Sequence, residues 1–259
     1  MLRKRIIFTL IYDNGFFNQS RNFRLQKVGD VEWLENNYNF RNIAFSLDEL
    51  IVLNASRKDK NMLEFAKNLN KLVDNVFIPI AAGGGVRSLE DAKILFNNGA
   101  DKIVINTIVY TDKNLVQELI AKYGSQSIIA SIDYKKTDKK LKVFIKDGTV
   151  EIDIDLFEYI EYIENLGAGE IYLNSIDQDG TGFGYDFETI HKIAKTISIP
   201  LIIAGGAGNE KHLEKGLKMD RVNAVATANL FNFIGNGLPN ARERLLEKNI
   251  NLARWEKNI

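Results

Sequence analysis

Two glycine clusters are the first residues in this sequence whose types and spacing could do chemistry. Gly83-Gly84-Gly85 and Gly205-Gly206-Ala207-Gly208 each follow a short aliphatic run and precede the expected start of a helix. Glycine lets the backbone approach an anion closely, and the free N–H groups at a helix N-terminus attract negative charge. The pair predicts two phosphate sites and a ligand with phosphate at both ends. Glycines that only make tight turns would give the same pattern.

A carboxylate follows the fifth expected strand. Asp133 ends the run SIIASID, between the places where the two glycine clusters are expected to lie. Such a carboxyl can act as a general acid or base if burial raises its pKa toward neutrality. The alternative is a structural carboxylate that accepts loop N–H bonds. The corresponding position of the first strand is Ile11, which cannot exchange a proton. Alternation along the strand directs Tyr12 away from the centre, and Asp13 is expected beyond the strand end.

Four charged residues stand at the opposite, N-terminal ends of expected strands. They are Arg5, Glu49, Lys102 and Glu170. Side chains at the starts of strands of one barrel would meet at its floor, where they could form a ring of ion pairs. A purely structural salt-bridge layer is the alternative interpretation.

The elements that must position these residues are read from the hydrophobic pattern. Nearly continuous aliphatic runs are typical of parallel strands that are covered on both faces. They occupy residues 5–11, 49–54, 77–82, 102–106, 127–133, 170–175, 199–204 and 223–228. Helical spacing appears between them at 61–73, 88–100, 112–124 and 155–167, and Ser88 with Asp91 predicts a capping-box start. Eight strands alternating with helices predict a single α/β domain over 1–259, a (β/α)8 TIM barrel.

The two halves of the chain resemble each other. Pro79 and Pro200 begin similar segments at an offset of 121 residues, and the same offset relates Glu49 to Glu170. This period predicts two fused (β/α)4 half-barrels rather than a solenoid. Chance likeness among apolar strands is the alternative.

Composition excludes several classes of protein. The 259 residues carry 34 basic and 34 acidic side chains, no cysteine and two histidines. Zero net charge gives no attraction for nucleic acid or anionic lipid. The absence of cysteine excludes disulfides, thiolate nucleophiles and cysteine metal sites. No apolar run approaches the roughly 20 residues that span a bilayer. We therefore expect a cytoplasmic protein with no metal, no cofactor and no nucleic-acid or membrane partner.

Longer motifs carry a family resemblance. KRII at 4–7, GGGVRSLEDA, NNGADKIVINT, GSQSIIASID, LGAGEIYLNSIDQDGTGFGYD and IPLIIAGGAGN together resemble the cyclase subunit of imidazole glycerol phosphate synthase. The resemblance runs from about residue 2 to residue 234. It implies a barrel of the ribulose-phosphate-binding type with half-barrel symmetry, and a glutaminase partner in a heterodimer. In that family, ammonia from the glutaminase enters the barrel floor and reaches the top, where a ribulose-type bisphosphate is cyclised and cleaved.

The resemblance also implies roles for particular residues. Arg5, Glu49, Lys102 and Glu170 match the ammonia gate, Asp101 matches a contact to the glutaminase, and Asp133 matches one of two catalytic aspartates. One phosphate site matches Gly85, Asn106 and Thr107, and the other matches Asp179, Gly180 and Gly206.

The departures from the family pattern are concentrated at the expected active site. Ile11 replaces the first catalytic aspartate, Asn54 replaces an aspartate that ends strand two, and Gln19 replaces a lysine that touches substrate. Ala204 and Asn229 stand where serines border the second phosphate site. Loss of one proton-transfer group typically removes a factor of about 10² to 10⁴ in rate.

The pattern resembles a branch of acetamidino-modification proteins of surface-polysaccharide clusters, which share the opening MLR-x-RII. This branch implies a lyase-like synthase subunit that passes ammonia to an ATP-dependent sugar amidotransferase, and we favour it over the cyclase of histidine biosynthesis. A third interpretation is a scaffold that bridges the two partner enzymes and binds no small molecule.

Overall fold

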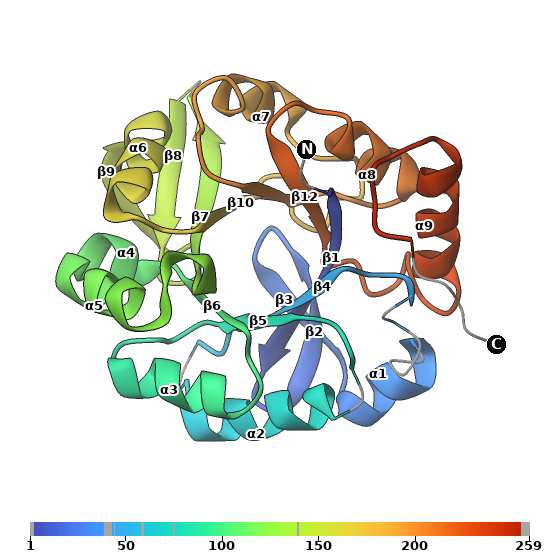
Figure 1. Cartoon of the computed structure of the whole chain (residues 1–259), viewed down its shortest axis with the longest axis horizontal. Helices are drawn as coiled ribbons and strands as arrows, with labels where there is room; N and C mark the ends of the chain where they lie inside the picture. Colours follow the sequence, from blue (N-terminus) through green and yellow to red (C-terminus); the bar gives the residue numbers. More distant parts are fainter. Residues whose placement is uncertain are drawn as a thin grey trace.

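The eight aliphatic runs of the sequence form the eight parallel strands of a closed barrel in the computed structural model (Figure 1). The structure describes residues 3–38, 43, 45–57, 60–74, 76–138 and 140–254. Around the barrel the strand order is β1 (Arg5–Asp13), β4 (Glu49–Asn54), β5 (Ile80–Gly83), β6 (Lys102–Ile105), β7 (Ile128–Thr137), β10 (Glu170–Ser175), β11 (Leu201–Ala204) and β12 (Val222–Thr227). Because β12 pairs with β1, the barrel closes, and the predicted TIM barrel is confirmed.

Helices cover the outside of the barrel (Figure 1). They are α1 (Val31–Tyr38), α2 (Met62–Val73), α3 (Leu89–Asn97), α4 (Thr107–Thr111), α5 (Lys113–Tyr123), α6 (Leu156–Leu166), α7 (Phe187–Ile193), α8 (Glu210–Leu217) and α9 (Gly237–Glu247), with a 3₁₀ turn at Ser125–Ser127. The four predicted helical segments correspond to α2, α3, α5 and α6. Ser88 is the N-cap of α3, since Asp91 N donates to Ser88 Oγ at 3.1 Å, and Asp91 Oδ2 accepts from Ser88 Oγ at 2.9 Å and from Arg87 N at 2.8 Å.

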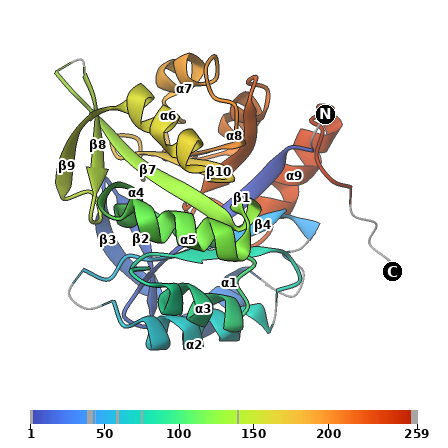
Figure 2. The same ribbon diagram turned by 60° about the vertical axis from the view of Figure 1, so that its left-hand side comes forward.

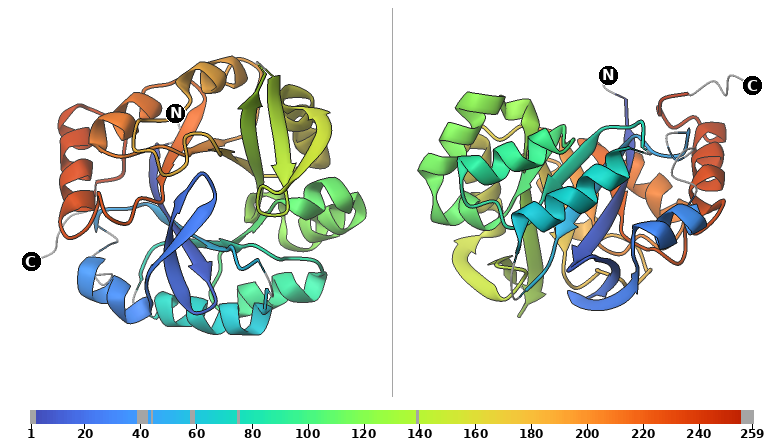
Figure 3. Two further views of the ribbon diagram at one scale, coloured as in Figure 1. Left: turned by 180° about the vertical axis from the view of Figure 1, so that it is seen from behind. Right: turned by 90° about the horizontal axis from the view of Figure 1, so that it is seen from below.

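Two antiparallel hairpins extend the barrel and were not predicted. β2 (Phe16–Arg21) folds back on β1 and pairs with β3 (Arg24–Gly29). β8 (Lys140–Ile145) folds back on β7 and pairs with β9 (Val150–Asp155). Both lie at the end of the barrel where β1 and β7 finish (Figure 2), and the β2–β3 hairpin, in blue, lies across this end in Figure 3. Each hairpin therefore borders the face on which barrel enzymes build their sites.

Apolar side chains pack on both sides of the strands. The larger cluster lies between the barrel and its helices and includes Phe8, Leu10, Leu50 and Phe65. The interior cluster consists of Ile7, Ile51, Ala81, Val104, Ile129, Tyr172, Ile202, Ala204, Ala224 and Ala226, with Leu53 packed against it. Burial of both strand faces explains why the strands appear in the sequence as continuous apolar runs.

Candidate active site

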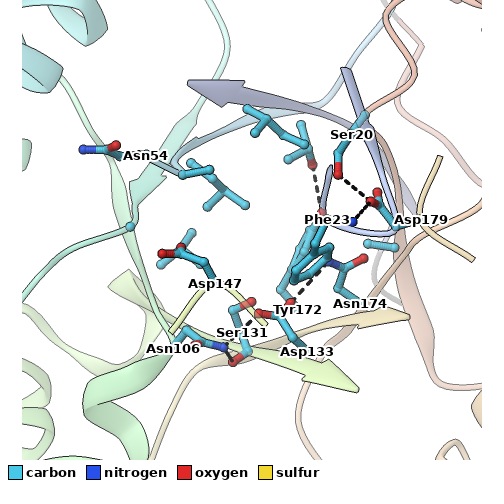
Figure 4. A pocket seen from close by; sticks show the side chains of 18 of the residues that line it. Ser20, Phe23, Asn54, Asn106, Ser131, Asp133, Asp147, Tyr172, Asn174 and Asp179 are labelled. Atoms are coloured by element: carbon cyan, nitrogen blue, oxygen red, sulfur yellow. Dashed lines mark hydrogen bonds between the residues drawn. The ribbon is translucent and has the colours of Figure 1, made fainter. Parts of the chain in front are cut away.

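A pocket of about 880 Å³ opens at the carboxyl end of the barrel strands. Its lining includes both glycine clusters, the ends of β1, β6, β7 and β10, and the two hairpins. Figure 4 shows Asn106, Ser131, Asp133 and Asn174 gathered along one side of it. The sequence residues expected to bind ligand thus border one cavity, large enough for a drug-sized molecule.

Asp133 is a buried carboxylate of this pocket. Its side chain comes from β7, and the residue is 8% exposed. Asn174 Nδ2 donates to Oδ1 at 3.2 Å, and Asn106 Nδ2 donates to Oδ2 at 3.2 Å (Figure 4). Burial raises the pKa of Asp133 to about 7, and the hydrogen bond from Asn174 opposes that rise. A carboxyl with this pKa can take up and release a proton near neutral pH.

Ile11 lines the same pocket from β1 and supplies no proton-transfer group. Tyr12 points to the outside, as predicted: its ring packs against Phe65 with centroids 5.2 Å apart, and its hydroxyl accepts from Asn68. Asp13 was expected beyond the strand, but it is the last residue of β1, where it pairs with Phe16 in the hairpin. The described pocket lining does not include Asp13. A second carboxylate therefore does not face Asp133 from β1.

The two glycine clusters occupy equivalent places in the two halves of the barrel. Gly84 has φ +90° and Gly205 has φ +87°. A Cβ on Gly84 would overlap the carbonyl oxygen of Asn54, and a Cβ on Gly205 would lie 2.6 Å from the carbonyl oxygen of Ser175. Asn54 and Ser175 end β4 and β10 and are themselves 121 residues apart. Both clusters thus make a close turn against the end of the preceding strand, which only glycine can adopt without strain.

The first predicted phosphate site contains a cation that the sequence analysis did not identify. Gly85, Asn106 and Thr107 line the pocket here, and Lys60 packs beside Gly85. Lys60 Nζ donates to Asp147 Oδ1 at 2.7 Å and to the carbonyl oxygen of Asn54 at 3.0 Å. Asp147 belongs to the turn between β8 and β9, so this ion pair ties that hairpin to the rim of the site.

The second predicted phosphate site is built around Asp179, Gly180 and Gly206, which also line the pocket. The Asp179 carboxylate accepts hydrogen bonds from Ser20 Oγ and from the backbone N–H of Phe23 at 3.0 Å (Figure 4). Burial raises the pKa of Asp179, against these two hydrogen bonds. In this structure the carboxylate therefore holds the β2–β3 hairpin over the pocket.

The other departures from the family pattern have structural partners. Gln19 Oε1 accepts from Leu230 N at 2.8 Å, which joins the β2–β3 hairpin to the segment after β12. Asn54 Oδ1 accepts from Ser56 N, and Figure 4 shows its amide directed away from the side chains around Asp133. Asn229 Oδ1 accepts from Phe231 N and Asn232 N, and Ala204 belongs to the interior cluster. Each side chain has a local role that requires no ligand.

The four charged residues at the other end of the barrel form the predicted ring of ion pairs. Arg5 contacts Glu49 at 2.6 Å and Glu170 at 3.2 Å, and Lys102 contacts the same two carboxylates at 3.2 Å each. Burial raises the pKa of Glu49, which Arg5 and Lys102 oppose. We call Arg5, Glu49, Lys102 and Glu170 the charged ring. It is partly accessible, since the side chains of Arg5 and Lys102 are 21% and 19% exposed.

Asp101 lies at the same end of the barrel, next to Lys102. Its carboxylate accepts from Ile80 N at 2.8 Å, and its own N–H donates to Ile80 O at 2.7 Å. Asp101 is exposed. The predicted contact residue is therefore available to a molecule that approaches the charged ring.

The described residues include neither a metal-binding cluster of side chains nor a membrane-spanning helix. No group of three or more His, Asp or Glu side chains among them could hold a metal ion. No helix in this part of the chain is long and apolar enough to cross a bilayer.

Comparisons with known proteins identify relatives over almost the whole chain. A family model described as "Histidine biosynthesis protein" matches residues 35–235. The chain is 46% identical over 256 residues to the putative imidazole glycerol phosphate synthase subunit hisF2 of Parasynechococcus marenigrum, covering 98% of this chain and 95% of that protein. It is 34% identical over 251 residues to the imidazole glycerol phosphate synthase subunit HisF of Chlorobium limicola, covering 96% and 98%. The subunit HisF of Flavobacterium psychrophilum is 36% identical over 234 residues, covering 90% and 92%.

Proposed function

We propose that this chain, which belongs to the HisF family of imidazole glycerol phosphate synthase cyclase subunits, uses ammonia from a partner glutaminase in a reaction on a phosphorylated small molecule. One observation carries the proposal. The charged ring and the Asp133 pocket lie at opposite ends of one barrel, on the inward faces of the same strands. β10 carries Glu170 in the ring and Asn174 beside Asp133, four residues further along. Ammonia entering at the ring would therefore reach the buried carboxylate through the interior.

The partner follows from what this chain lacks. It contains no cysteine, so it cannot itself be a cysteine-dependent glutaminase. We place the glutaminase at the face that carries the charged ring and the exposed Asp101, in a heterodimer. The names of the HisF relatives, as subunits of a synthase, support a complex with at least one further chain.

Asp133 is the group we assign to proton transfer. Ammonia must lose a proton when its nitrogen bonds to an electrophilic carbon, and an ionised carboxylate within reach can accept that proton. The amides of Asn106 and Asn174 fix the two carboxylate oxygens. Gly85 with Asn106 and Thr107, and Gly180 with Gly206, would hold the phosphates at the two sides of the pocket.

Two reactions compete for this site. The relatives named above are imidazole glycerol phosphate synthase subunits, which supports the cyclase reaction of histidine biosynthesis better than the sugar amidation favoured by the sequence analysis. The isoleucine at position 11 still favours sugar amidation as the second candidate, because the pocket contains Asp133 but no carboxylate from β1. In that case the barrel would deliver ammonia to an ATP-dependent sugar amidotransferase for acetamidino modification of a polysaccharide sugar.

The deciding experiment supplies the purified chain with the ribulosyl intermediate of histidine biosynthesis and an ammonium salt, and measures product. Turnover that disappears in Asp133→Asn supports the cyclase function. No turnover by the wild-type chain, with glutamine-dependent sugar amidation in the presence of its partners, supports the second candidate. If neither product forms and phosphate at millimolar concentration does not bind, the scaffold interpretation replaces both.

A further inference from the structure

A hydrogen bond crosses the interior of the barrel between the charged ring and Asp133. Tyr172 Oη and Thr9 Oγ1 are 3.1 Å apart, and the two residues are 3% and 2% exposed. Their strands, β10 and β1, are not neighbours: β11 and β12 separate them on one side and four strands on the other. A bond between side chains of these strands must therefore span the lumen of the barrel.

The position of this bond along the barrel axis follows from strand geometry. Glu170, Tyr172 and Asn174 alternate on the inward face of β10, and two residues of a parallel strand advance roughly 7 Å. Tyr172 thus lies about midway between the charged ring and the amide that holds Asp133. The pocket is lined by Thr9 and Tyr172, whereas its described lining does not include Ile7 or Ile129, which lie closer to the ring. The Tyr172–Thr9 bond is the floor of the pocket.

The surroundings of the bond are apolar. The interior cluster contains aliphatic side chains and Tyr172, its one aromatic member among the described residues. Burial raises the pKa of the Tyr172 hydroxyl, so it stays protonated over the physiological range. Two hydroxyls that bond to each other use one of their two protons. The pair therefore still offers one O–H donor and oxygen lone pairs to a guest.

We propose that Tyr172 and Thr9 form a second constriction on the route from the charged ring to Asp133 and bind ammonia there in transit. This inference rests on the proposed function. Ammonia has one lone pair and three N–H donors. These complement the lone pairs of the two hydroxyls and the one O–H donor that the Tyr172–Thr9 bond does not use. Moving a polar molecule through aliphatic surroundings without a hydrogen-bond partner is unfavourable. The pair supplies that partner, and the tyrosine ring must move aside to let the molecule through.

The test compares two ammonia sources in the complete complex with its glutaminase. The readout is the ratio of product formed with saturating glutamine to product formed with a saturating ammonium salt. External ammonia can reach Asp133 from the open pocket, so it serves as a reference for the chemistry. Tyr172→Phe keeps the ring and removes the hydroxyl, and Thr9→Val removes the other hydroxyl at similar volume. We expect each to lower the ratio about fivefold, the effect of one net hydrogen bond, with released ammonia appearing in the medium.

Three further variants distinguish an effect on the passage of ammonia from an effect on the stability of the barrel. The double variant should lower the ratio further than either single one, because each single variant leaves one hydroxyl as a partner for ammonia and the double variant leaves none. Thr9→Ser keeps a hydroxyl and should keep the wild-type ratio. Tyr185→Phe is the matched control, since Tyr185 is also a buried tyrosine but donates to Ala226 O at 3.0 Å and packs in the outer cluster. It should leave the ratio unchanged.

The outcomes distinguish this inference from the proposed function. If the wild-type complex forms product from glutamine and the Tyr172→Phe and Thr9→Val ratios equal or exceed the wild-type ratio, the second constriction is wrong and the proposed function stands. A wild-type complex that hydrolyses glutamine but transfers no ammonia to product overturns both.

Discussion

Replacing Asp133 by asparagine should stabilise the protein at alkaline pH while it removes the proposed proton-transfer group. Burial raises the pKa of Asp133 from its ordinary value of 3.8 to about 7. Between these values the folded state binds a proton that the unfolded state releases, so the contribution of Asp133 to stability falls as pH rises through this window. At about 1.4 kcal/mol for each pH unit, the loss amounts to about 4 kcal/mol.

The assay is urea unfolding of the wild type and Asp133→Asn at pH 4 and at pH 8, followed by fluorescence and circular dichroism to check that the two transitions coincide. Near pH 4 the wild-type carboxyl is neutral in the folded state, so its ionisation should contribute little to the difference in free energy of unfolding between the two proteins. On going from pH 4 to pH 8, the free energy of unfolding of the variant should rise by about 4 kcal/mol relative to that of the wild type. Glu49, whose pKa burial also raises, is present in both proteins, and its contribution cancels in the comparison.

Ser131→Ala is the control, because Ser131 is a buried neighbour on β7 without an ionisable side chain. Its effect on the free energy of unfolding should be the same at both pH values. If the difference between wild type and Asp133→Asn is also the same at pH 4 and pH 8, then Asp133 is not held with a raised pKa, and its assignment as a neutral-pH acid and base fails.

Further variants test the glycine turn, the replacement at Ile11 and the charged ring. Gly15→Ala, at φ +86° with nothing near the added methyl, should lower the free energy of unfolding by about 1 to 2 kcal/mol. Gly84→Ala also drives its methyl into Asn54 O and should cost at least about 3 kcal/mol in urea unfolding, so equal losses would contradict the close turn. Ile11→Asp should raise turnover of the ribulosyl intermediate at least about tenfold and add a limb to the pH–rate profile, and an equal gain in Ile11→Asn would refute a proton-transfer role. Glu49→Gln should lower glutamine-dependent product formation at least about tenfold in the complex and leave ammonia-dependent formation within about twofold, whereas a parallel loss of both would exclude a role in ammonia entry.

The barrel and its inward residues could be predicted from the sequence because strands that are buried on both faces consist of apolar residues. Strands covered on both faces must be apolar throughout, so each aliphatic run marks a strand. A charged residue at the start of such a run, such as Lys102 or Glu170, then has to lie at the rim of the barrel. The glycine clusters were equally readable, since a positive φ against the end of a strand requires glycine at that position.

The hairpins were missed although a turn signal precedes or interrupts each of them. Asn14-Gly15 joins β1 to β2 with φ 46° and 86°, and Asp147-Gly148 lies in the turn from β8 to β9. Asn-Gly and Asp-Gly are strong hairpin signals. The flanking strands are partly exposed and contain several charged residues, as in RLQKVG of β3, so they lack the apolar runs that mark the barrel. The Lys60–Asp147 ion pair gave no sequence signal, because it joins two loops 87 residues apart.

The replacement at Ile11 and the pKa of Asp133 belong to one physical argument. A single carboxylate that must both accept and return a proton works best when its pKa is close to the working pH. Ile11 lines the same pocket from β1, on the opposite side of the barrel from β7, and adds no charge to it, and desolvation by burial is the largest cause of the raised pKa of Asp133. An aspartate at position 11 would add a carboxylate to the same pocket and divide acid and base between two groups. The chain with isoleucine there retains one carboxyl that carries a proton in about half of the molecules near pH 7. Under the proposed function, chemistry at this site therefore depends on Asp133 in both protonation states, so its rate should pass through a maximum near neutral pH.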